Sequence, residues 1–395
     1  MNAADQYYFD ERVWRRGRNL LALVGAVSVA AAAAGWAENN AQFAASYVVS
    51  YVYFTIIALG AAFFVMLQHL TGSAWSVTVR RMMENLMAVL PASAVLFAPI
   101  ALNLPALYEW AHPEFYSSDP VMQFKIVFFN PAFYMLRMAA YFLVWTVLAV
   151  ALYRNSIAQD EGGSLERIRK ASAWSAPGLL ALMVTVTMAA VDLLMSLEPH
   201  WYSTIFGIYV YSGGALAFVC LLTLICLGLR RAGYLRNAIH VEHYHDLGKW
   251  QFALTIFWAY IAFSQYLLIW YANIPEETIW FKHRLENNWA WVSGLLLGGR
   301  FILPFLALLS RAAKRSLGVL GFMSAWGLLM HWVDVHWVVM PTLHRHAFHV
   351  HWLDVATFLA VGSLYGLVFW TRLRNKALAP VGDLRFEQAL HFKNI

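Results

Sequence analysis

The chain has few charged residues and almost no cysteine. Charged side chains make up 13% of its 395 residues, whereas soluble domains contain roughly 25%. Its two cysteines, Cys220 and Cys226, form neither a CxxC nor a CxxCH motif. Such motifs hold thiolate-bound iron–sulfur clusters and attach c-type haem. The sequence therefore excludes a soluble redox protein that carries either of these groups itself.

Long apolar stretches take the place of charged segments. Hydrophobic residues make up 61% of the chain, and an α-helix needs roughly 20 of them to cross a bilayer. About ten stretches meet this length. The sequence predicts an all-α integral membrane protein with spans at 19–36, 44–70, 86–108, 130–153, 171–196, 201–229, 247–270, 288–310, 317–340 and 351–371.

The distribution of basic residues predicts the orientation. Lys and Arg gather on alternate loops, which are expected on the cytoplasmic side of a membrane. These loops hold most of the 28 basic residues, including Arg80 and Arg81, whereas Lys282 and Arg284 fall in an outer loop. Both termini are then cytoplasmic. The formal net charge of +6 follows from this asymmetry and indicates contact with anionic lipids rather than with nucleic acid.

The order of the spans predicts two parallel repeats. Spans two to five and six to nine can be superposed as four-helix bundles, since an even number of helices returns the chain to the side where it began. We expect a cytoplasmic N-terminus and flanking helix at 1–43 and the first bundle at 44–200. The second bundle follows at 201–340, and an outer loop, a flanking tenth helix and a cytoplasmic tail occupy 341–395.

Each bundle contains an arginine and an aspartate at matching places inside its spans. Arg137 and Asp192 belong to the first bundle, and Tyr134 and Tyr141 share the helical face of the arginine. A charge within a membrane span is costly, and this makes it a candidate for function. The first pair has two open interpretations, namely a proton-transfer or quinone site and a buried ion pair that fixes helix register.

The corresponding group of the second bundle also contains a histidine. Arg300 follows two glycines near mid-membrane, and His331 lies three residues before Asp334 on one helical face. Imidazole and carboxylate groups in a low dielectric relay protons. The same two interpretations stay open for this group.

Other titratable residues give weaker signals. His69 and Glu84, near the inner ends of spans two and three, are candidates for proton entry, although ordinary headgroup-level polarity explains them more simply. Histidine tracts at 240–245 and 344–351 allow metal binding, but interface and loop roles are favoured. We expect no metal site, and no b-type haem because no paired histidines lie at matched depth.

One segment carries a family resemblance. From Asp192 to Tyr209 the sequence DLLMSLEPHWYSTIFGIY resembles the NrfD/polysulfide-reductase family of membrane subunits, in particular those of bacterial alternative complex III. That complex is a respiratory quinol:cytochrome c oxidoreductase of the bacterial inner membrane. The resemblance implies a multi-pass subunit with a proton path, and it allows a quinone (menaquinone) pocket near the outer face. It carries Asp192, Glu198 and His200 over as site candidates.

The resemblance also implies partners that hold the redox groups. These are a sister NrfD-like subunit, periplasmic multihaem cytochrome c and iron–sulfur subunits, and small membrane subunits. Haems and iron–sulfur clusters are then expected only on those partners, in electron transport with proton translocation. Two other functions stay open from the sequence: a structural anchor for extrinsic subunits, and a proton-coupled transporter.

Overall fold

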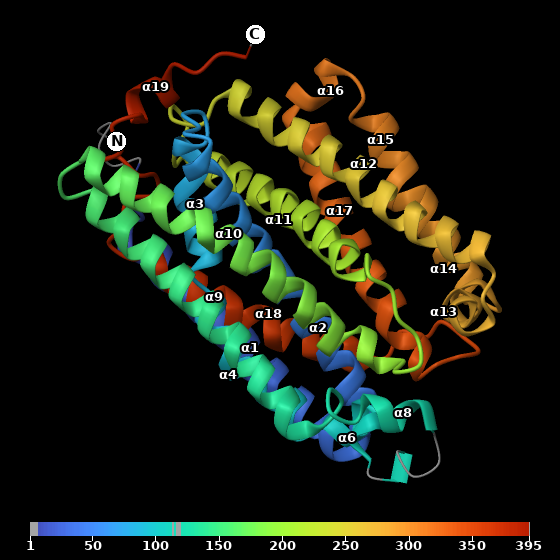
Figure 1. Ribbon diagram of the computed structural model, residues 1–395. Helices are drawn as coiled ribbons and strands as arrows, with labels where there is room; N and C mark the ends of the chain where they lie inside the picture. The colour runs from blue at the N-terminus through green and yellow to red at the C-terminus, as the bar shows by residue number, and fades with distance from the viewer. Residues whose placement is uncertain (1–6, 113, 116–119, 395) are drawn as a thin grey trace.

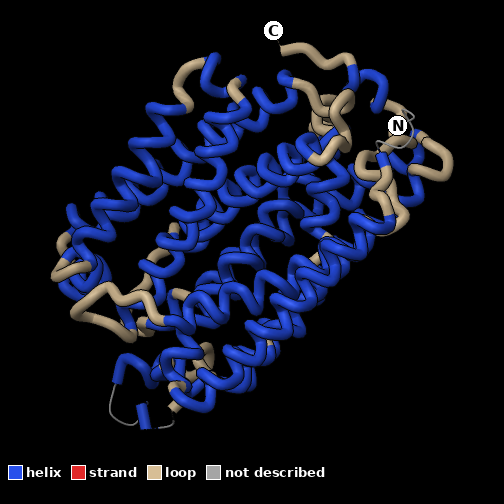
Figure 2. The backbone as a smooth tube through the Cα atoms, turned by 180° about the vertical axis from the view of Figure 1, so that it is seen from behind, coloured by secondary structure: helices blue, strands red, loops and turns tan. Residues whose placement is uncertain are grey.

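The computed structural model describes residues 7–112, 114–115 and 120–394, with side-chain detail from 122 onward in the last range. Within these residues the regular structure is entirely helical (Figure 1). Ten segments, each a single helix or a run of consecutive helices, are long and apolar enough to cross a membrane. Most loops lie at the two ends of the helical bundle (Figure 2). The predicted all-α architecture with ten candidate spans is therefore confirmed.

The spanning helices have the following bounds. They are α1 (Glu11–Glu38), α2 (Asn40–Leu70), α3 (Val77–Met87) with α4 (Leu90–Leu96) and α5 (Ala98–Leu102), α9 (Pro131–Gln159), α10 (Leu165–Leu193) with η3 (Met195–Leu197), α11 (Phe206–Arg231), α12 (Val241–Ala272), α14 (Trp289–Leu295) with η4 (Leu296–Ile302) and α15 (Leu303–Ala307), α17 (Leu317–Val339) with η5 (Met340–Thr342), and α18 (Trp352–Arg372). The shorter elements are α6 (Leu104–Leu107), η2 (Glu109–Ala111), α8 (Pro120–Lys125), α13 (Pro275–Leu285), α16 (Arg311–Arg315) and α19 (Phe386–Leu390).

Helix α2 forms the centre of the molecule. In its most apolar window 89% of the residues are buried, against 22% in α1. It packs against α3, α10, α11, α17 and α18. Within the first predicted bundle α9 packs on α10 and α4, and within the second α11 packs on α12 and α17. The flanking helices α1 and α18 pack along each other (Figure 1). The parallel repeat itself stays a prediction.

Two spans are interrupted, and the residues explain why. The third span begins at Val77, earlier than the predicted 86, and is divided into α3, α4 and α5. Pro91 and Pro99 lie at the starts of α4 and α5, because proline has no N–H for a continuing helix. The eighth span contains the π-helical turn η4, which includes Arg300. Such turns are frequent at functional sites.

Both ends of the chain lie at one end of the bundle, and α6, α8 and α13 lie at the other (Figure 1). The placement of both termini on one side agrees with an even number of spans. Which side is cytoplasmic stays a prediction.

Candidate functional site

The first charged cluster consists of Arg137 on α9, Asp192 on α10 and Tyr141. Arg137 donates from Nη2 to Oδ1 of Asp192 at 2.7 Å and from Nε to Oδ2 at 3.0 Å, which is a bidentate pair. The Tyr141 hydroxyl donates to Oδ2 at 2.9 Å. The remaining Nη1 of Arg137 donates to the Phe128 carbonyl at 2.9 Å. The predicted contact is present, and its hydrogen-bonding groups are well satisfied.

Tyr134, also predicted for this site, takes a different partner. Its hydroxyl lies 3.4 Å from that of Tyr108, which donates to the Leu193 carbonyl at 3.1 Å. Tyr134 is fully buried, and its ring packs on Trp110 with centroids 5.3 Å apart. It supports the end of α10 and has no direct bond to the Asp192 carboxylate.

The second charged cluster consists of Arg300, His331, Asp334 and Tyr209. Nη2 of Arg300 lies 3.2 Å from Nδ1 of His331 and 3.4 Å from Oδ2 of Asp334. The Tyr209 hydroxyl donates to Oδ1 of Asp334. Among the described residues, Nε and Nη1 of Arg300 and Nε2 of His331 have no hydrogen-bond partner. The predicted trio is assembled, but it keeps unused donors and acceptors.

The backbone makes room for this cluster. Gly213 on α11 faces the arginine, since a Cβ added there would lie 2.8 Å from Nη2 of Arg300 and 3.3 Å from Oδ2 of Asp334. Gly299, in the π-helical turn, lets that turn approach Met330 and Trp326 of α17. The guanidinium carbon of Arg300 lies 4.7 Å from the ring centre of Trp258, within the range of a cation–π contact.

An apolar cavity of about 460 Å³ adjoins the second cluster. Tyr209 and Trp258 line it next to the charges, and Gln265 lines it from α12. Phe263 and Leu297 also line it and are about 60% exposed, on the apolar surface that would face lipid. Oε1 of Gln265 is buried and accepts no hydrogen bond from any described residue. Ligand sites typically join an apolar wall to a few polar groups in this way.

Glu198 lies away from both clusters. Its carboxylate pairs with Arg284 of α13 at 3.0 Å and lies 3.5 Å from His283. Arg284, which the sequence predicted to fall in an outer loop, lies in the short helix α13 between two spans. It is fully buried and donates to the carbonyls of Trp280, Trp337 and Val338. Burial lowers the pKa of Arg284, and Glu198 opposes this shift. Arg284 therefore ties α13 to the end of α17, and Glu198, which follows η3, pairs with this arginine.

His200 is exposed, and its ring packs edge-on against Phe115 with centroids 5.9 Å apart. The other histidine tracts take part in local structure. His351 caps the start of α18 and His240 caps α12. His344 lies 2.6 Å from the Gln42 amide oxygen, and Nε2 of His243 lies 3.1 Å from the Ala389 carbonyl.

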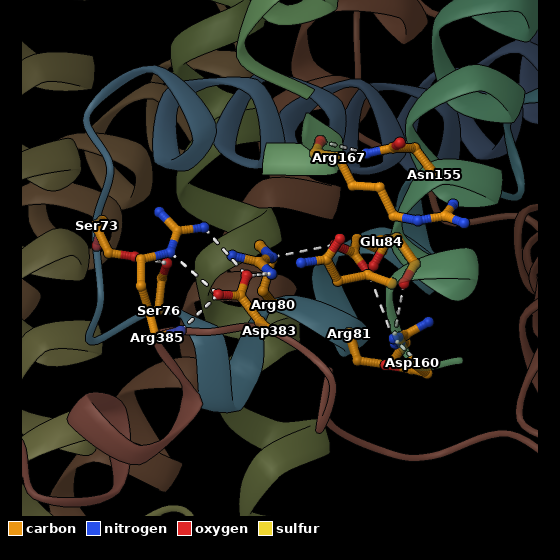
Figure 3. A network of polar contacts seen from close by, with 12 residues as sticks. Ser73, Ser76, Arg80, Arg81, Glu84, Asn155, Asp160, Arg167, Asp383 and Arg385 are labelled. Atoms are coloured by element: carbon orange, nitrogen blue, oxygen red, sulfur yellow. Dashed lines mark hydrogen bonds and ion pairs between the residues drawn. The ribbon is translucent and has the colours of Figure 1, made fainter. Parts of the chain in front are cut away.

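A third group of charges surrounds α3 (Figure 3), which lies at the end of the bundle that holds the termini (Figure 1). Arg80 and Arg81 belong to α3 and are buried, so the prediction that they occupy a loop was wrong. Glu84 lies 3.2 Å from Arg80 and 3.6 Å from Arg81, and it accepts a hydrogen bond from Ser156 at 2.5 Å. Arg81 pairs with Asp160 at 2.7 Å. Glu84 is therefore fully buried within an ion-pair network.

The C-terminal tail completes this network. Asp383 pairs with Arg80 at 2.5 Å and with Arg385 at 3.1 Å. Burial alone would raise the pKa of Asp383, but the hydrogen bond from Arg385 and the charge of Arg80 hold that pKa well below its ordinary value. His69 is buried nearby, and neither of its ring nitrogens has a partner among the described residues. The predicted inner pair, His69 and Glu84, thus lies at this end with no direct hydrogen bond between the two.

Sequence reasoning missed the residues that connect the second cluster to its cavity. Tyr209 ends the segment that carries the family resemblance, but a tyrosine in a membrane helix is too common to be singled out. Gln265 is a polar residue in an apolar helix, and this was the available signal. Comparison of the chain with models of protein families and with curated proteins found no match. The function of the chain is therefore inferred from the geometry of the second cluster and its cavity and from the sequence resemblance.

Proposed function

We propose that this chain is the membrane subunit of a respiratory quinol oxidoreductase and that it binds quinol beside the second cluster. The observation that carries the proposal is the apolar cavity of about 460 Å³, which extends from lipid-facing Phe263 and Leu297 to Tyr209. Its size is typical of small-molecule sites, roughly 300–1,000 Å³. A quinol has an apolar ring and tail with hydroxyl groups on the ring, and this cavity offers matching surfaces.

The polar groups are placed to receive quinol hydroxyls. The buried amide oxygen of Gln265 can accept one hydrogen bond. The phenol of Tyr209 lines the same cavity and donates to Asp334, so it links a bound ring to a carboxylate. Because Arg300 lies 3.4 Å from Asp334, a proton gained there changes the charge balance of the whole cluster.

Quinol oxidation releases two protons and two electrons, and the proposal assigns only the protons to this chain. The electrons pass to redox groups of partner subunits, of the cytochrome c and iron–sulfur type that the family resemblance implies. The proposed location is the bacterial inner membrane, with the cavity towards the outer face. The buried network around Glu84 is a further candidate for a proton path.

Filling the cavity tests this proposal. Ala262 lines it on α12, and Ala262→Trp should weaken quinone binding at least about 10-fold because the ring and the indole compete for one volume. A second apolar cavity of about 460 Å³, between α1, α2, α11 and α18, contains Ile225 and supplies the matched control Ile225→Trp. Quinone affinity is measured on the full chain, purified with its native partners.

The outcomes separate the alternatives. Loss of affinity in Ala262→Trp with affinity retained in Ile225→Trp supports the proposal. Unchanged quinol oxidation in both variants, in an intact complex, contradicts it and favours a structural anchor. Solute uptake into vesicles that contain only this chain would favour a transporter.

A further inference from the structure

Three arginines meet at the end of α11 that lies on the side of the termini. Arg230, Arg231 and Arg236 line a cavity of about 350 Å³ whose other walls are Leu227, Leu317 and Gly318. No acidic side chain of the described part of the chain lines this cavity. Among the described ion pairs of the chain, none involves these three arginines. Three positive charges therefore line this cavity without a carboxylate from the described residues.

The local backbone brings these like charges together. Gly233 has a φ of +97°, and the Tyr234 N–H donates to the Leu229 carbonyl at 2.9 Å, as in a glycine-terminated helix end. The chain turns back there, so Nε of Arg236 donates to the Arg230 carbonyl at 3.0 Å. Arg230 in turn donates from Nη1 to the Ile239 carbonyl at 3.0 Å. These bonds hold the side chains of Arg230 and Arg236 in the same turn of the chain, although their like charges repel.

Apolar surface continues from the charges along α17. Gly318 lines the cavity, and Phe322, one turn further on the same helical face, is 61% exposed. Val319 is also exposed. A soluble anion would match the arginines alone, whereas a phospholipid also covers the apolar face with its acyl chains. Basic pockets at the ends of membrane helices are typical sites for anionic headgroups.

We propose that this cavity binds the phosphate headgroup of one anionic phospholipid, whose acyl chains lie along α17. A second basic cavity of the chain offers a comparison. Another polar cavity at the same end, of about 410 Å³, contains Arg154, Arg372 and Lys376, but Glu161 lines it as well. The carboxylate of Glu161 offsets part of the positive charge there. An external anion is therefore expected to bind more tightly at the Arg230 cavity.

The test uses the full chain in detergent with added phosphatidylglycerol or phosphatidylcholine, followed by native mass spectrometry. The variant Arg231→Gln/Arg236→Gln removes two charges and the bond from Arg236 to the Arg230 carbonyl, and it leaves the bond from Arg230 to the Ile239 carbonyl. The control Arg154→Gln/Lys376→Gln removes two charges from the other cavity. We expect the first variant to bind phosphatidylglycerol about 30-fold more weakly, the equivalent of about 1 kcal/mol for each arginine.

Selective retention of phosphatidylglycerol by the wild type and the control, with loss in the variant, supports the site. Equal retention by wild type and variant overturns it. Inorganic phosphate supplies a further test, measured as the thermal shift of the wild type. If phosphate raises Tm as much as phosphatidylglycerol does, the cavity is a site for soluble anions and the lipid proposal fails.

Discussion

Arg137 and Asp192 form a closed pair, whereas Arg300 and Asp334 form an open one. In the first cluster two hydrogen bonds of 2.7 and 3.0 Å join the side chains, and the third guanidinium nitrogen, Nη1, donates to a carbonyl. In the second cluster the nearest approach of arginine to aspartate is 3.4 Å, and two guanidinium nitrogens lack partners among the described residues.

The difference indicates that the two arginine–aspartate pairs serve different purposes. A fully bonded buried pair mainly fixes how two helices fit together, and apolar replacements of similar volume often substitute for it. A buried pair with unused donors, next to a cavity, retains the capacity to receive a ligand or a proton. We therefore propose that the first cluster is a structural connection between α9 and α10 and that the second is the working site.

Neutralising Asp334 should have the largest effect on quinol oxidation. Asp334→Asn should lower quinol oxidation by about 10²–10⁴-fold, the usual range for losing a proton-transfer group. Steady-state quinol oxidation by the purified complex measures this effect. The folded variant Arg137→Met/Asp192→Leu of the first cluster is the matched comparison. An Asp334→Asn enzyme of wild-type rate would remove the second cluster from the mechanism.

Replacing both residues of the first pair should lower the stability of the protein less than removing one of them. Asp192→Ala leaves Arg137 buried without its partner and should destabilise the protein by about 3–5 kcal/mol. Arg137→Met/Asp192→Leu removes both charges and should restore most of that loss. Thermal unfolding and quinol oxidation are measured on both. If the folded double variant is as inactive as Asp334→Asn, the first cluster also transfers protons.

A methyl group at Gly213 should disturb the second cluster more gently. Gly213→Ala places a Cβ 2.8 Å from Nη2 of Arg300, so the guanidinium must move from His331 and Asp334. We expect about 1 kcal/mol of destabilisation, at the low end for overpacking, with a several-fold loss of quinol oxidation. Gly228→Ala on the same helix is the control, because its Cβ would meet no atom within 4 Å. Equal effects of the two substitutions would contradict the proposed fit.

Helical period and residue type were enough to predict ten spans, although the third begins earlier than predicted, and the arginine, aspartate and histidine members of both clusters. Arg137 and Asp192 lie in adjacent spans at similar depth, and a buried charge has few partners available, so their contact followed from the pattern. His331 and Asp334 share a helical face by their spacing alone. Such local rules depend only on short stretches of sequence.

The remaining features depend on packing between distant segments. Asp383 lies in the tail yet completes the buried network at Arg80, and charge counting alone placed Arg80 and Arg81 in a loop. The cavity exists because α12, α13 and α14 do not fill the space between them. A gap between helices has no signature in a single sequence, and neither does an amide oxygen, such as that of Gln265, without a partner among the described residues.

Photolabelling with an azido-quinone tests the central claim most directly. The full chain in its native membranes is labelled with and without excess unmodified quinone, and the labelled peptides are identified by mass spectrometry. The account predicts label on α12 around Ala262 and Gln265 or on α14 and η4 around Leu297, removed by competing quinone. Competed label confined to the first bundle or to the cavity at Ile225 would contradict it.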